Sequence, residues 1–81
     1  MDPVLTTTQL GRILQSARRA RGLTQQDLGS LVGLSQKRIS ALELRPGSIT
    51  AEQLLSICGA LGLELSIQKK PLVAREPGLE W

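Results

Sequence analysis

The sequence predicts an all-α domain of four to five helices, with one strand near its C-terminal end. Three observations predict it. Apolar residues recur at helical spacing through most of the chain, a Ser or Thr precedes each of these stretches, and residues 63–68 alternate strictly between apolar and polar. A chain of 81 residues forms one domain with a small core, so a partner subunit would add stability.

Four segments carry the helical pattern. The first covers about residues 7–21, and the others follow Thr24, Ser35 and Thr50. Capping boxes are expected at Thr6 with Gln9, Thr24 with Asp27, and Thr50 with Gln53. The expected stops are Gly22, Gly33, Pro46-Gly47 and Gly62. The expected core-facing residues are Leu10, Ile13, Leu14 and Ala17; Leu28, Leu31 and Val32; Ile39 and Leu42; and Leu54, Leu55, Ile57, Cys58 and Leu61.

Residues 63–69 are predicted to be a dimerisation strand, because Leu63, Leu65 and Ile67 alternate with polar residues. A single strand leaves its backbone groups unpaired, and the same strand of a second subunit would pair them across a homodimer. The alternative is an extended segment that lies on the helices. We therefore expect a helical domain over 1–62, the strand, and a flexible tail over 70–81.

The composition excludes several classes of protein. The chain has no His and one Cys, so His-based catalytic sites, Cys-cluster zinc sites and internal disulfides are absent. No nucleophile–base pair is visible, and we expect no enzyme, cofactor or metal. Short apolar runs predict no membrane span, and without a secretory signal the expected location is the cytoplasm, on the nucleoid when bound to DNA. Cys58 lies on an apolar helix face, which favours a core residue over a redox sensor.

The positive charge is concentrated in the first half of the chain. The whole chain has a formal net charge of +3. Residues 12–45 hold seven basic and two acidic side chains, which gives this segment +5 and leaves −2 for the remainder. This asymmetry favours a polyanionic partner such as nucleic acid. The alternative is a solvated basic face that has no partner.

Residues 23–43 follow a helix–turn–helix pattern. In the second helix Ile39 and Leu42 face the core, and the opposite side is polar and small. That side carries Lys37, Ser40 and Ala41, with Ser35 and Gln36 at the N-terminal tip. Such a surface can enter a major groove, where Gln can pair with adenine and Lys with guanine. The hydroxyl of Ser35 at the helix N-terminus suits a phosphate, and Arg38 and Arg45 flank the helix as expected phosphate contacts.

The pattern resembles the Xre/Cro-type helix-turn-helix family over about residues 9–62. The residues that carry the resemblance are Leu23-Thr24-Gln25, Leu28, Gly33, Ser35-Gln36, Ile39 and Leu42-Glu43. The resemblance implies that Gln36 reads bases and that Gln25 contacts a phosphate and supports Gln36. It also implies a structural ion pair between Arg18 and Glu43. The base-reading set predicted for double-stranded operator DNA is Gln36, Lys37, Ser40 and Ala41.

The C-terminal part is similar to the HipB-type antitoxins within this family. Residues 63–67 follow the fourth helix directly, and the tail ends Leu79-Glu80-Trp81. The resemblance implies a homodimer joined partly by a small intersubunit sheet, repression of its own operon, and binding of a HipA-type Ser/Thr kinase toxin. In the best-known member the tail also ends Leu-Glu-Trp and the terminal Trp docks on the kinase. Leu79, Glu80 and Trp81 are therefore the expected toxin-binding residues, with Trp81 as the anchor.

Two alternatives remain open from the sequence. The protein could be a free-standing Xre-family repressor without a toxin partner, or a protein-interaction adaptor that binds no DNA. Lys37 departs from the best-known HipB-type pattern because it adds a charge to the reading surface. The operator sequence therefore does not carry over from the family.

Overall fold

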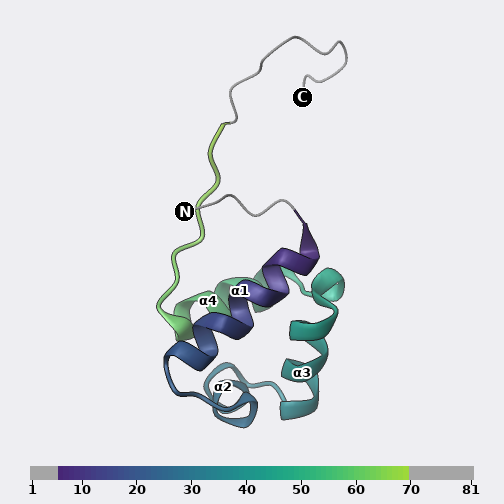
Figure 1. Cartoon of the computed structure of the whole chain (residues 1–81), viewed down its shortest axis with the longest axis vertical. Helices are drawn as coiled ribbons and strands as arrows, with labels where there is room; N and C mark the ends of the chain where they lie inside the picture. The colour runs from purple at the N-terminus through teal and green to yellow at the C-terminus, as the bar shows by residue number, and fades with distance from the viewer. Residues whose placement is uncertain (1–5, 70–81) are drawn as a thin grey trace.

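Four α-helices and one 3₁₀ turn make up the domain in the computed structural model, which describes residues 6–69. They are α1 (Thr7–Ala20), α2 (Gln25–Val32), α3 (Gln36–Leu44), η1 (Pro46–Ser48) and α4 (Ala51–Leu61). In Figure 1, α1 crosses in front of α4, with α2 below it and α3 at its side. The predicted all-α helix-turn-helix fold is confirmed.

Local side-chain caps explain where the helices begin. The hydroxyls of Thr6, Thr24 and Thr50 accept the backbone N–H three residues later, at 3.1, 2.9 and 3.0 Å. In each case the side chain at that later position accepts the Thr backbone N–H, so all three predicted capping boxes are confirmed. The backbone N–H and the hydroxyl of Thr24 hold the pKa of the Asp27 carboxyl below its usual value.

All four α-helices contribute to one aliphatic core. Its buried members are Leu14, Leu28, Ile39, Leu42, Ile57, Cys58 and Leu61. Three expected core residues, Ile13, Leu31 and Leu55, are instead 38 %, 62 % and 57 % exposed. On α2 the buried face runs through Leu28 and Gly29, and on α4 through Ile57 and Cys58. At 100° per residue Leu31 and Leu55 lie about 110° from the centres of those faces, so both side chains lie outside the covered faces.

Residues 63–69 leave α4 on the side away from α3 and have no regular secondary structure. Leu63 packs against the core, but Leu65 and Ile67 are 46 % and 93 % exposed. A strand is defined by its pairing, and one chain offers this segment no partner strand. The intersubunit strand therefore stays a prediction. Residues 1–5 and 70–81 lie outside the described residues, and with them Leu79, Glu80 and Trp81.

Candidate nucleic-acid interface

Helix α3 is anchored by its apolar side and presents its polar side to solvent. Ile39 and Leu42 are each 1 % exposed. Of the predicted base-reading residues, Gln36, Lys37 and Ala41 are exposed and Ser40 is half-buried. Because Ile39 and Leu42 are fixed in the core, the orientation of the polar side relative to the other helices is fixed as well.

The turn between α2 and α3 sets the angle at which α3 is presented. Gly33 ends α2 at φ 74°, a left-handed conformation that favours glycine. The N–H of Leu34 then donates to the carbonyl of Gly29 at 2.9 Å. A side chain at Gly29 would collide with the backbone carbonyl of Leu34, so the turn lies closer to α2 than any other residue at this position would allow.

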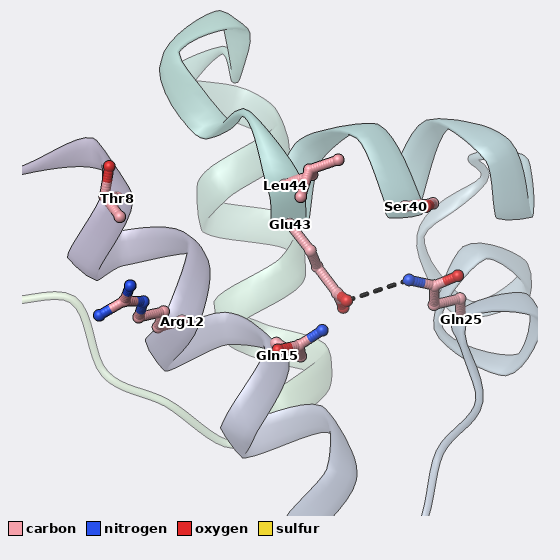
Figure 2. Close-up of a pocket in the computed structure, with 7 residues that line it drawn as sticks. All are labelled: Thr8, Arg12, Gln15, Gln25, Ser40, Glu43 and Leu44. Carbon is pink, nitrogen blue, oxygen red and sulfur yellow. Dashed lines mark hydrogen bonds between the residues drawn. The ribbon is translucent and has the colours of Figure 1, made fainter.

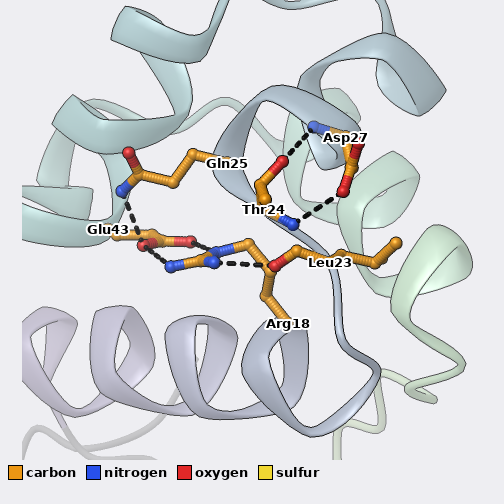
Figure 3. Close-up of polar contacts among 6 residues, drawn as sticks. All are labelled: Arg18, Leu23, Thr24, Gln25, Asp27 and Glu43. Carbon is orange, nitrogen blue, oxygen red and sulfur yellow. Dashed lines mark hydrogen bonds and ion pairs between the residues drawn. The ribbon is translucent and has the colours of Figure 1, made fainter.

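A buried polar network joins α1, α2 and α3 behind this surface (Figure 3). The guanidinium of Arg18 donates from Nε and Nη2 to the two carboxylate oxygens of Glu43, at 2.6 and 3.1 Å. Its Nη1 donates to the carbonyl of Leu23 at 2.8 Å. The hydrogen bond to Glu43 raises the pKa of Arg18 above its ordinary value, so Arg18 stays charged. The structure thus forms the ion pair that the family resemblance implied.

Gln25 hydrogen-bonds to Glu43, a partner that the resemblance did not name. Its amide donates to Oε1 of Glu43 at 3.1 Å (Figure 3), and within residues 6–69 no hydrogen bond joins it to Gln36. Glu43 offers Gln25 a charged acceptor, which makes a stronger hydrogen bond than a neutral amide does. The support of Gln36 by Gln25 and the phosphate contact of Gln25 both stay predictions.

The other predicted phosphate contacts surround the two ends of α3. The hydroxyl of Ser35 caps α3 by accepting the N–H of Arg38 at 3.0 Å. The side chain of Arg38 is half-buried, and Arg45 is exposed at the C-terminal end of the helix. Within the described part of the chain neither arginine forms an ion pair, so both guanidinium groups are open to an anion.

Two hollows lie beside α3. One of about 470 Å³ is lined by Arg18, Arg19, Thr24, Gln25, Gln26 and Gln36. The other, of about 320 Å³, is lined by Thr8, Arg12, Gln15, Gln25, Ser40, Glu43 and Leu44 (Figure 2). Sequence reasoning did not single out Arg12, Gln15 or Arg19. The only sequence signal for the two arginines is the excess of basic residues over 12–45, and no sequence signal points to Gln15.

Other kinds of site find no support in residues 6–69. They hold no group of three or more His, Cys, Asp or Glu side chains that could bind a metal ion. None of the helices in this range is long and apolar enough to cross a bilayer.

The helix-turn-helix family model matches residues 14–68. This match covers more than half of the chain, so the chain belongs to the helix-turn-helix family. No curated protein sequence matches it.

Within the family the structure is similar to HipB. The HipA–HipB–O2–O3 complex contains a chain that is 25 % identical, with a TM-score of 0.79 over 88 % of this chain and 100 % of that one. The HipB–O4 20mer complex gives 25 % identity and a TM-score of 0.78, with the same coverage. The resemblance to HipB-type proteins that the sequence predicted is confirmed.

The fold also occurs within a larger chain. FeII HppE in complex with substrate matches at 27 % identity and a TM-score of 0.66, over 72 % of this chain but only 33 % of HppE. A shared fold therefore does not fix a function, which has to be argued from the surface of α3.

Proposed function

We propose that this protein is a homodimeric, sequence-specific DNA-binding repressor of its own operon that also neutralises a HipA-type Ser/Thr kinase toxin. One observation carries the proposal. Ile39 and Leu42 anchor α3 in the core while Gln36, Lys37 and Ala41 of the same helix face solvent. The protein would act on nucleoid DNA in the cytoplasm.

The exposed side of α3 suits a major groove. A groove admits one helix, and the side chains at positions 36, 37, 40 and 41 are short or flexible enough to reach base edges. Gln25, Ser35, Arg38 and Arg45 are proposed to hold the flanking phosphates. Two copies of α3 in a dimer would enter successive major grooves roughly 34 Å apart on a palindromic operator.

A gel shift with the DNA upstream of the protein's own gene tests DNA binding. We expect a complex that weakens steeply between two salt concentrations, because each phosphate contact releases counterions. Random DNA of equal length should bind more weakly at both salt concentrations. An adaptor that binds only proteins would shift neither duplex, and this result would remove the DNA-binding proposal.

The proposed dimer uses the exposed side chains of the segment after α4. Leu65 and Ile67 are exposed in one chain, and pairing of residues 63–69 with a second copy would cover them. Ile67→Glu should shift the mass measured by light scattering towards the monomer. Leu31→Glu changes an exposed leucine on α2 and serves as the matched control. Equal masses for Ile67→Glu and the wild type would exclude the strand as the dimer contact.

Toxin neutralisation is supported by the similarity to HipB in its complex with HipA. We propose that Leu79, Glu80 and Trp81 contact the kinase. Deleting residues 79–81 should weaken kinase binding and leave the DNA complex unchanged. Unchanged kinase affinity would remove Trp81 from the proposal. A free-standing repressor would instead lack a kinase gene beside its own.

A further inference from the structure

The hollow between α1 and α3 is continuous with the proposed DNA-binding surface. Ser40 lines it and also belongs to the predicted base-reading set. Gln25 lines both this hollow and the one that reaches Gln36. In Figure 2, Arg12 and Gln15 stand on α1 along the opposite rim from α3. A DNA backbone that runs beside α3 would therefore pass along this rim.

The uncompensated charge at the hollow is positive. The carboxylate of Glu43 also lines the hollow, but the Glu43 side chain is only 5 % exposed. Its two oxygens accept from Nε and Nη2 of Arg18, which neutralises the charge. Arg12 is exposed and forms no ion pair within residues 6–69. The rim thus offers a free guanidinium, together with the amide of Gln15, which is half-buried beside it.

We propose that Arg12 contacts a backbone phosphate of the DNA beside the groove that α3 enters, so that the interface extends from α3 onto α1. A guanidinium is the side chain best suited to hold a phosphate, because its donors match two phosphate oxygens. This inference rests on the proposed DNA-binding function and names a further residue of that interface. The contact positions the protein and adds affinity without reading sequence.

Salt-dependent binding of the full-length protein tests the inference. The affinities of the wild type, Arg12→Ala, Arg12→Lys, Gln15→Glu and Arg21→Ala are measured on the upstream duplex and on a random duplex at several salt concentrations. Arg21→Ala is the matched control, because it removes an exposed arginine from the C-terminal end of α1, where Arg21 donates to the carbonyl of Leu61 on α4.

We expect Arg12→Ala to reduce the slope of log affinity against log salt by about 0.9 per subunit, equally on both duplexes. Arg12→Lys should keep the wild-type slope, because it retains the charge. Gln15→Glu should weaken both complexes, and Arg21→Ala should change neither. Thermal melts check that each variant remains folded.

The results that overturn the inference differ from those that overturn the proposed function. If the wild type binds DNA and Arg12→Ala has the same slope as the wild type or Arg21→Ala, Arg12 makes no phosphate contact, while the function stands. A loss seen on the upstream duplex alone would also overturn the inference, because it would mean base reading. If the wild type binds neither duplex, the function and the inference fail together.

Discussion

Arg18 on α1 and Glu43 on α3 form the ion pair that joins the two helices beneath the proposed DNA-binding surface, with Nε 2.6 Å from Oε2. Their side chains are 8 % and 5 % exposed. Removing one partner leaves a buried charge without compensation. We expect Glu43→Ala to lower the free energy of unfolding by about 3–5 kcal/mol, measured by urea denaturation.

A double variant that replaces both Arg18 and Glu43 separates two contributions to stability. One is the free energy that the ion pair adds, and the other is the penalty for leaving one charge buried without its partner. Arg18→Met combined with Glu43→Leu replaces the pair by apolar side chains of similar size, which is often neutral or stabilising. The double variant should therefore be more stable than Glu43→Ala. A double variant that is as unstable as the single one would mean that the pair itself, including the bond to Leu23, holds the helices together.

Gly11 determines how closely α1 approaches the end of α3. The Cβ of an alanine at this position would collide with the backbone carbonyl oxygen of Glu43 and lie 3.1 Å from Cγ of Pro46. Alanine favours a helix by about 1 kcal/mol over glycine. The collision should outweigh this gain, because overpacking costs about 1–3 kcal/mol. We expect Gly11→Ala to lower the urea midpoint.

Gly59 on α4 supplies the matched control for this substitution. It is exposed, and a Cβ there would meet no atom within 4 Å. Gly59→Ala should therefore raise the free energy of unfolding by up to about 1 kcal/mol. Stabilisation of both variants would show that α1 can move away from α3 without loss.

The parts of the fold that depend on neighbouring residues were predictable from the sequence. The capping boxes of Thr6, Thr24 and Thr50 each depend on a side chain three residues away, and all three form as predicted. The core positions Ile39 and Leu42 also follow from helical spacing alone. Ile13, Leu31 and Leu55 were predicted wrongly, because spacing places residues on a face but does not show where the neighbouring helices cover it.

The contacts between elements were less predictable. Arg18 and Glu43 are 25 residues apart, and only the family resemblance paired them. No sequence pattern shows that Gln25 donates to Glu43, or that Arg12 and Ser40 line one hollow. These relations depend on the angles at which α1, α2 and α3 pack. The pairing of residues 63–69 depends on a second chain, which a single chain cannot show.

If α3 reads bases, substitutions on its exposed side should reduce the preference of the protein for one DNA sequence over another. Gln36→Ala and Lys37→Ala should each lose about 1–3 kcal/mol of preference for the upstream duplex over random DNA, because each removes hydrogen bonds to base edges. Competition gel shifts at one fixed salt concentration measure this preference.

Arg38→Ala and Arg45→Ala are the comparison variants for this experiment. As proposed phosphate contacts, both should weaken binding to the two duplexes about equally and leave the preference unchanged. If Gln36→Ala also weakened both duplexes equally, α3 would hold the DNA without reading it, and the base-reading role would have to be assigned elsewhere.

Cys58 is predicted to be an unreactive thiol in the folded protein. It is 6 % exposed, and burial raises the pKa of its thiol. Labelling requires that the reagent reaches the sulfur and that the thiol is ionised. A disulfide reagent at pH 8 should therefore react at least about ten times more slowly with the native protein than with the urea-unfolded one. Rapid native labelling would mean that α4 opens readily or that the thiol is exposed.

The same burial predicts how stability depends on pH in the alkaline range. The unfolded thiol loses its proton near pH 8.5, whereas the folded thiol keeps it to higher pH. The unfolded state therefore binds fewer protons there, and stability should fall as the pH rises above that value. Cys58→Ala lacks this titration, so the drop in its urea midpoint from pH 7 to pH 9.5 should be smaller than in the wild type. Equal drops would show that Cys58 ionises as easily in the folded chain as in the unfolded one, contrary to its place in the core.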